Sequence, residues 1–259
     1  MVENDAPDAA VEPQRKPWRR HAAALAKGIA GFIVPAACLT CRDRLADTDS
    51  VCPTCWRRID FIRPPLCDRL GLPMPYGTGG IMVSAAAVAR PPAYDRARAV
   101  ARFDGVMRDL VHGFKYADRH EARRLFSRWM MEAGKDLIGD ADVVVPVPLA
   151  RSRLLWRRYN QAAILASDIA AARGKIFAPL ALKRIRKTPS QVGLTPDQRQ
   201  RNVAGAFAVP VSQQHVLADR SVLLIDDVIT TGATIEACAR VLRRSRVARV
   251  DVLALALVT

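Results

Sequence analysis

The most informative stretch of this chain reads VLLIDDVITTGATIEAC and spans residues 222–238. Its first four residues are apolar, as in a strand of a parallel sheet that is buried on both faces. An acidic pair, Asp226 and Asp227, follows at once, then a loop of hydroxyl and glycine residues, then apolar residues at helical spacing from Ile235. This order predicts a loop whose backbone N–H groups and helix dipole bind an anion, beside carboxylates that hold sugar hydroxyls or a metal.

The residues DDVITTGAT, 226–234, resemble the signature with which type I phosphoribosyltransferases bind phosphoribosyl pyrophosphate (PRPP). In that family the acidic pair contacts the ribose hydroxyls, and the small-residue loop binds the 5-phosphate. The resemblance therefore implies that Asp226 and Asp227 hold ribose. It assigns the phosphate to Thr230, Thr231, Gly232, Ala233 and Thr234. The alternative is a tight turn in an ordinary doubly wound sheet, which does not need two adjacent acids at a strand end.

The length and composition suit one sizeable α/β core plus a small extra module, with 259 residues of which 50% are hydrophobic. The net charge of +15 and the pI near 10.3 favour a polyanionic partner: nucleic acid, an anionic membrane surface or a phosphate-rich ligand. A surface that is simply rich in arginine is the alternative. The apolar residues 22–37 are broken by Lys27 and are too few to span a membrane. We therefore expect a cytoplasmic protein without a transmembrane segment.

Four of the six cysteines form two close pairs, each with two residues between its members, and ten residues separate the pairs. They are Cys38, Cys41, Cys52 and Cys55. Each pair can form a turn that offers two thiolates to one ion, and two such turns complete the tetrahedral four-sulfur shell of a structural zinc. Reactive dithiols and an iron–sulfur cluster are the alternatives. The other two cysteines, Cys67 and Cys238, stand alone.

Strand-like and helix-like patterns alternate from residue 97 onward. The predicted strands are 97–103, 142–148, 222–225 and 250–258, and the predicted helices are 106–116, 121–137, 154–172 and 235–245. Such alternation predicts a parallel sheet flanked by helices, with ligands bound beyond the carboxyl ends of its strands. Residues 64–92 are predicted to form an extended connector with a short helix near its end, and no internal repeat is evident beyond the cysteine pairs.

A four-cysteine ribbon ahead of a phosphoribosyltransferase-like domain resembles the ComF (competence protein F) family, and the resemblance covers nearly all of residues 38–259. The blocks that carry it are the PRPP-like segment, HGFKYADR at 112–119, VVPVPL at 144–149, RRYNQAAILA at 157–166 and KTPSQVGLTPDQRQRNVAGAF at 187–207. The last of these also resembles the phosphoribosyl domain of glutamine amidophosphoribosyltransferases, whose N-terminal glutaminase cysteine has no counterpart here. The resemblance implies an α/β fold of the type I phosphoribosyltransferase kind with a small N-terminal zinc-ribbon module.

The resemblance also implies the domain order. We expect a disordered tail at 1–17, a helix with the zinc-ribbon module and connector at 18–75, and the phosphoribosyltransferase-like domain at 76–259. Many members of the family carry a second set of cysteine pairs after the first. Here Leu70 stands where a cysteine would follow Cys67, so we expect one structural zinc rather than two.

Displacement of pyrophosphate from the anomeric carbon needs positive charge or Mg²⁺ on the pyrophosphate and a closed, dry site. The candidates on the pyrophosphate side are Lys115, Pro148, Arg151 and Arg153. Residues 183–202 are expected to cover the site as a mobile lid. Its candidate contacts are Arg184, Gln191, Arg199 and Asn202. Each cation has an alternative as a solvated surface charge, or as a nucleic-acid contact in the lid. No general base or nucleophile stands out, so the catalytic residues stay unassigned.

Three functions are compatible with these features. The first is an accessory role in DNA uptake during natural transformation, with single-stranded DNA and DNA-uptake or recombination proteins as partners. The second is Mg²⁺-dependent transfer of ribose 5-phosphate from PRPP to an acceptor that the sequence does not identify. The third is a sensor that binds PRPP without turnover, or a scaffold for DNA or protein partners. Aromatic residues make up 6% of the chain and are not interleaved with the Lys/Arg runs, so no platform for stacking bases is evident.

Overall fold

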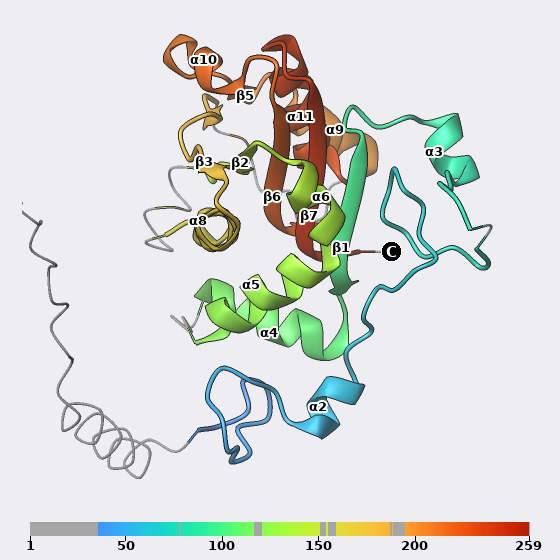
Figure 1. Cartoon of the computed structure of the whole chain (residues 1–259), viewed down its shortest axis with the longest axis vertical. Helices are drawn as coiled ribbons and strands as arrows, with labels where there is room; N and C mark the ends of the chain where they lie inside the picture. Colours follow the sequence, from blue (N-terminus) through green and yellow to red (C-terminus); the bar gives the residue numbers. More distant parts are fainter. Residues whose placement is uncertain are drawn as a thin grey trace, which may run out of the picture.

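The computed structural model describes residues 36–77, 79–116, 121–150, 154, 159–186, 188 and 195–258. A five-stranded parallel sheet forms its centre (Figure 1). The strands lie in the order β1 (Arg96–Arg102), β7 (Arg249–Leu257), β6 (Ser221–Ile229), β2 (Val143–Pro146) and β3 (Ile176–Phe177). The predicted parallel sheet is therefore confirmed. No helix in these described ranges is long and apolar enough to cross a membrane.

Helices cover both faces of this sheet. One face carries α4 (Gly105–Tyr116), α5 (Ala122–Ala133), α6 (Lys135–Asp140) and α8 (Gln161–Arg173). The other face carries α9 (Pro196–Val203), α10 (Gln214–Leu217), the 3₁₀ turn η1 (Val211–Gln213) and α11 (Ala233–Arg244). A small antiparallel pair, β4 (Lys183–Arg184) and β5 (Phe207–Ala208), lies outside the sheet.

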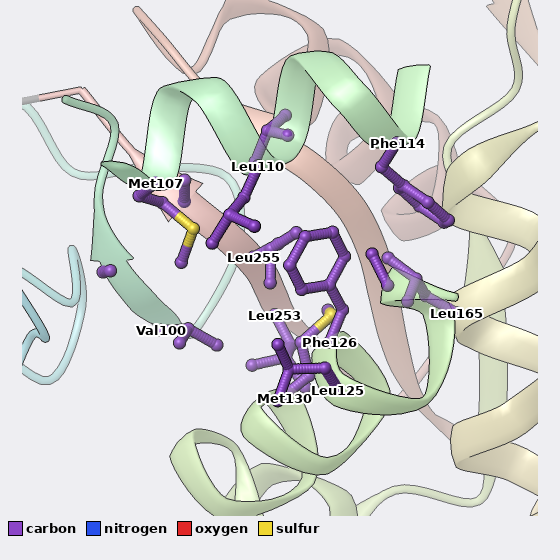
Figure 2. Close-up of a cluster of buried hydrophobic side chains, with 14 of the residues drawn as sticks. Val100, Met107, Leu110, Phe114, Leu125, Phe126, Met130, Leu165, Leu253 and Leu255 are labelled. Atoms are coloured by element: carbon purple, nitrogen blue, oxygen red, sulfur yellow. The ribbon is translucent and has the colours of Figure 1, made fainter. Parts of the chain in front are cut away.

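The side chains of the central strands alternate between two buried cores. In β6, Leu223 and Ile225 join the core under α5 and α8, whereas Val222 and Leu224 join the core under α11. Figure 2 shows the first core, in which side chains from α4, α5 and α8 meet those of β7. Burial of both faces explains why these strands read as continuous apolar runs in the sequence.

Two predicted elements differ from the observed ones on the first face of the sheet. The predicted helix 121–137 is broken into α5 and α6 at Gly134. A Cβ atom at Gly134 would lie 2.6 Å from a methyl carbon of Leu253, so a larger residue here would require the Leu253 side chain to shift. In the predicted helix 154–172, Leu154 is helical but residues 159 and 160 are not, and α8 begins at Gln161, where the Asn160 side chain caps it.

Three predicted elements differ near the carboxyl ends of the strands. Strand β6 does not end before the acidic pair but runs through it to Ile229, because pairing with β7 continues to that residue. Helix α11 begins at Ala233, two residues before the predicted start. The predicted irregular lid contains β4, which pairs with β5 beyond the lid, and most of α9, which begins with a capping box formed by Thr195 and Gln198. The predicted tail 1–17 and the helix predicted after it lie outside the described residues.

The N-terminal module consists of two lobes. Lobe 1, residues 36–62, carries the paired cysteines and α2 (Pro53–Arg57), and lobe 2, residues 65–90, carries α3 (Ala85–Ala89). Figure 1 shows lobe 1 below α4 and α5, and lobe 2 beside the edge strand β1. The short helix is confirmed, but 64–92 is not a plain connector, because lobe 2 repeats the backbone of lobe 1. The repeat lies mainly in backbone hydrogen bonds, so the sequence indicated only its first two positions, Cys67 and Leu70, through the family resemblance.

Candidate functional site

The sheet has a switch point between β2 and β6. The chain leaves β2 through α8 toward β3, and it leaves β6 through α11 toward β7 on the other side. The two connecting helices therefore lie on opposite faces, an arrangement in which a ligand crevice is expected beyond the carboxyl ends of β2 and β6. The two strand ends are joined by a hydrogen bond from Val147 N–H to Ile225 O, at 2.9 Å. Pro148 follows the first strand and Asp226 belongs to the second, so the fold brings both predicted site residues to this crevice.

A tight turn connects the acidic pair to α11. Gly232 has a φ of +73° and forms the N-cap of the helix, a left-handed conformation that favours glycine. Its carbonyl accepts the N–H of Glu236 at 2.8 Å, which starts the helical ladder. The N–H groups of the first helical turn have no intrahelical acceptors, and Thr230 and Thr231 are exposed beside them. The predicted phosphate loop thus has the backbone geometry of an anion site.

The two acids differ in their surroundings. Desolvation, together with the neighbouring charge of Asp227, raises the pKa of Asp226 to about 8. Asp227 Oδ2 instead lies 2.9 Å from Lys115 Nζ, and both of these side chains are about 15% exposed (15% and 14%). Asp227 N–H also donates to Asp226 Oδ1 at 2.9 Å. The raised pKa of Asp226 favours its protonated form at neutral pH, while Asp227 forms an ion pair with Lys115.

Residues at the start of α8 hold the end of α4, which carries Lys115. Tyr159 Oη donates to Phe114 O at 3.2 Å, and Gln161 Nε2 donates to Lys115 O at 3.4 Å. Asn160 donates to Val147 O at 3.0 Å, while its Oδ1 accepts Ala162 N–H and caps α8. These positioning residues were not assigned from the sequence. Their signal was the block RRYNQAAILA, which the family resemblance had singled out without giving its members roles.

The other predicted site residues are only partly described. In this structure Lys115 contacts the acidic pair, and its role toward a pyrophosphate stays a prediction. Arg151, Arg153 and Gln191 lie outside the described residues. In the predicted lid, Arg184 donates to Thr188 and lies over the ring of Phe207, with its guanidinium carbon 5.3 Å from the ring centroid. Arg199 and Asn202 belong to α9, which packs against α11, and Asn202 O accepts from Arg186 at 2.9 Å.

The four paired cysteines converge in lobe 1. All four sulfur atoms lie within 4.8 Å of one another, and those of Cys41 and Cys52 are 3.6 Å apart. A tetrahedral zinc with bonds of about 2.3 Å would place its sulfur ligands about 3.8 Å apart, so the residues fit one structural zinc ion. Backbone N–H groups also face the thiolates, since Cys52 N–H donates to Cys38 Sγ at 3.2 Å. No other such group occurs within the described ranges.

Comparison with known families defines the class of this protein. A double zinc ribbon domain matches residues 29–87, and a phosphoribosyl transferase domain matches residues 160–258. The chain is therefore a phosphoribosyltransferase-type α/β protein with an N-terminal zinc-binding module. Among solved structures, glutamine PRPP amidotransferase from B. subtilis is 21% identical, with a TM-score of 0.34 over 55% of this chain and 30% of that chain.

Full-length relatives identify the family. DNA utilization protein YhgH of Salmonella typhimurium is 31% identical over 228 residues, which cover 85% of this chain and 96% of that protein. YhgH of Escherichia coli is 30% identical over 228 residues, which again cover 85% of this chain and 96% of that protein. Competence protein F of Haemophilus influenzae is 27% identical over 225 residues, again with 85% and 96% covered. The chain belongs to this family of competence protein F and YhgH, and the expected ComF membership is confirmed.

Proposed function

We propose that the crevice between β2 and β6 binds PRPP as its Mg²⁺ complex, and that the protein is an accessory factor in DNA uptake that works in the cytoplasm. The observation that carries the first part is the place of Asp226 and Asp227 at the end of β6, directly before the Gly232 turn and the first turn of α11. The names of the relatives, competence protein F and DNA utilization protein, support the second part.

The geometry suggests which groups contact each part of PRPP. The acidic pair faces the position of the ribose hydroxyls, and residues 230–234 offer N–H and hydroxyl donors to the 5-phosphate. The loop after β2, with Pro148, is the place for the pyrophosphate. The proton on Asp226 allows that acid to donate a hydrogen bond, while Asp227 can only accept one. Mg²⁺ would neutralise the diphosphate oxygens.

Transfer to an acceptor is the activity that this arrangement would support. The bond from the anomeric carbon to the pyrophosphate oxygen breaks, the acceptor's nucleophilic atom forms the new bond, and its proton passes to the released pyrophosphate. The acceptor can supply the nucleophile, so no nucleophile from the protein is required. Tight PRPP binding without release of pyrophosphate across a panel of bases would identify a sensor instead of an enzyme.

Calorimetry with PRPP and Mg²⁺ tests the binding site. The wild type should bind, and D226N/D227N should bind at least about 100-fold more weakly, because the ribose hydroxyls lose the charged acceptor Asp227 and the carboxyl group of Asp226. D104N/D109N is the matched control, since it removes two exposed carboxylates from the start of α4. Absence of binding to the wild type, or equal binding by D226N/D227N, would reject the PRPP site.

A cluster on the surface supports contact with single-stranded DNA. The rings of Trp56, Phe61 and Trp129 lie with centroids 4.7 to 5.5 Å apart, and Trp56 is 43% exposed. The exposed cations Arg57 and Arg58 follow Trp56 directly. The cations adjoin Trp56 already in the sequence, and the tertiary structure adds Trp129 of α5 to the ring cluster of lobe 1. Exposed aromatic and basic groups of this kind bind single strands.

Substitution of Trp56 tests the DNA contact. W56A should weaken binding of a single-stranded oligonucleotide by roughly 5- to 100-fold, the cost of about one stacked base. Y76A is the matched control, because Tyr76 is 69% exposed but lies on lobe 2. Binding should fall steeply with salt. Equal losses in W56A and Y76A, or affinity that does not change with salt, would reject this surface as the DNA site.

A further inference from the structure

The first turn of lobe 1 and the first turn of lobe 2 share one hydrogen-bond pattern, with residue numbers shifted by 29. Cys38 O accepts the N–H of Arg42 at 3.1 Å, and Cys67 O accepts the N–H of Gly71 at 2.7 Å. The residue that donates has a left-handed backbone in both lobes, with φ of +67° at Arg42 and +68° at Gly71. Turns of this kind point the side chains of their first and fourth residues to the same side.

The strands around these turns keep the same shift. The antiparallel bridge Ala37–Arg44 of lobe 1 corresponds to the bridge Leu66–Pro73 of lobe 2. Two further pairs of hydrogen bonds, all at 2.8 Å, correspond as well: Cys38 N–Asp43 O with Cys67 N–Leu72 O, and Leu45 N–Ala36 O with Met74 N–Pro65 O. The two bridges consist of these hydrogen bonds, so three pairs of hydrogen bonds and one left-handed residue align in a single register.

The second turns of the two lobes align with a shift of 32. Cys52 N–H donates to Cys38 Sγ at 3.2 Å, and Ser84 N–H donates to Cys67 Sγ at 3.2 Å. Cys52 and Ser84 are the N-caps of α2 and α3, and each side chain accepts the N–H three residues on, from Cys55 and Ala87. The two short helices have the same length of five residues. The shift rises from 29 to 32 because the segment between the two turns is three residues longer in lobe 2 than in lobe 1.

This register identifies the four ligand positions of lobe 2. The positions of Cys38, Cys41, Cys52 and Cys55 correspond to Cys67, Leu70, Ser84 and Ala87. Cys67 is the single thiol among them, and Leu70 and Ala87 have no ligand atom. The second zinc that a double ribbon implies therefore does not fit lobe 2.

Packing and ion pairs take the place of the metal in lobe 2. Arg98 of β1 donates to Asp68 at 2.6 Å and to Asp136 at 2.8 Å, and its side chain is only 13% exposed. Arg69 donates to Pro92 O at 3.0 Å. The side chains of Leu66, Leu70 and Leu72 pack against the core beneath α11. Lobe 2 is thus tied to the edge strand by groups that do not depend on a metal.

We propose that lobe 2 is a zinc ribbon that folds without metal, and that Cys67, Leu70, Ser84 and Ala87 mark a dormant four-sulfur site. Because the backbone still has the ligand geometry of lobe 1, three thiols at positions 70, 84 and 87 should suffice to restore zinc binding.

Zinc content of the full chain tests this proposal. The wild type should contain one zinc per chain, and L70C/S84C/A87C should contain two. On replacement with Co²⁺, the absorption bands of the tetrathiolate site should double in intensity. The matched control is Y76C/V83C/V88C, which adds three thiols at exposed positions of the same lobe outside the register. It should contain one zinc. Two zinc ions in the wild type, or one in a folded L70C/S84C/A87C, would overturn the proposal.

Hydrogen exchange on the wild type gives a test that does not depend on the folding of a variant. Chelation of zinc should release the protected amides of lobe 1, such as Cys38 N–H and Leu45 N–H. The corresponding amides of lobe 2, Cys67 N–H and Met74 N–H, should keep their protection. Simultaneous loss of protection in both lobes would show that lobe 2 depends on metal, against the proposal.

Discussion

Lobe 1 and lobe 2 have the same backbone, but different interactions stabilise them. Lobe 1 gathers four thiolates, and one of its ion pairs to the body, Asp49–Arg124, involves an arginine that is 82% exposed. Lobe 2 has one thiol and is held by Arg98, which is 13% exposed and bonded to two acids. A ribbon of about 25 residues cannot bury enough surface to fold alone. The comparison shows that either a bound metal or a tightly docked neighbour can supply the stabilisation that such a small buried surface does not provide.

The largest difference between the lobes should come from their equivalent cysteines. C38S should cost several kcal/mol, because zinc binding supplies about 10–16 kcal/mol in isolated zinc-finger peptides and a four-sulfur site loses a ligand. C67S should cost on the order of 1 kcal/mol, since the serine oxygen can still accept the Ser84 N–H. Zinc content and thermal unfolding measure both. Loss of zinc in C67S would contradict the assignment of the zinc site to lobe 1 alone.

Substitution of the left-handed turn residue should affect stability strongly in lobe 2 and little in lobe 1. G71A should destabilise the protein by about 2–3 kcal/mol, because an L-residue is strained at a positive φ. In addition, its Cβ would lie 2.7 Å from Ala97 O, in the strand that holds lobe 2. R42G, at the equivalent position of lobe 1, should change stability by less than about 0.5 kcal/mol, as relief of strain offsets the entropy of glycine. Urea unfolding of the two variants compares the costs. A G71A variant as stable as R42G would show that lobe 2 is not docked tightly.

Removal of the docking cation should affect lobe 2 more than lobe 1. R98M should cost about 2 kcal/mol, because the partly buried carboxylate of Asp68 and the exposed carboxylate of Asp136 lose their partner, and solvent screens the second pair. R124M should cost less than about 0.5 kcal/mol, as expected of an exposed pair. Exchange rates of lobe 2 amides should rise in R98M alone. Equal effects of the two variants would contradict the assigned roles.

The last comparison asks whether the titration of Asp226 in the sheet is independent of the two lobes. Asp226 has a folded-state pKa of about 8, raised from 3.8. Between these values the folded protein keeps a proton that the unfolded chain has lost, so stability falls as pH rises from about 4 to about 8 and levels off above. D226N should remove this slope and stabilise the protein at pH 8, by at most about 6 kcal/mol, the upper bound that a pKa rise from 3.8 to about 8 sets.

Thermal unfolding between pH 5 and pH 9 measures the slope, with C67S as a control that should keep it. A slope that persists unchanged in D226N would assign the titration to another group.

The sequence predicted those parts of the candidate site whose residues are contiguous in the chain. Residues 226–234 lie in one strand, one turn and the start of one helix, so their order along the chain is also their order in space. The partner of Asp227 was not predictable in this way. Lys115 comes from α4, more than 100 residues earlier, and reaches the acid because α8 holds the end of α4.

The sequence by itself determined the local features of this protein. It showed the α/β alternation, the four cysteines that fit one zinc, and the glycine turn before α11, because each depends on neighbours in the chain. The tertiary structure alone decided three features: the split between Asp226 and Asp227, the contact of Trp129 with Trp56, and the register that matches Ser84 and Ala87 to Cys52 and Cys55. Desolvation, ring contacts and backbone hydrogen bonds arise only when distant segments meet. For that reason a lobe that has lost three of its four ligand cysteines can keep the ribbon backbone.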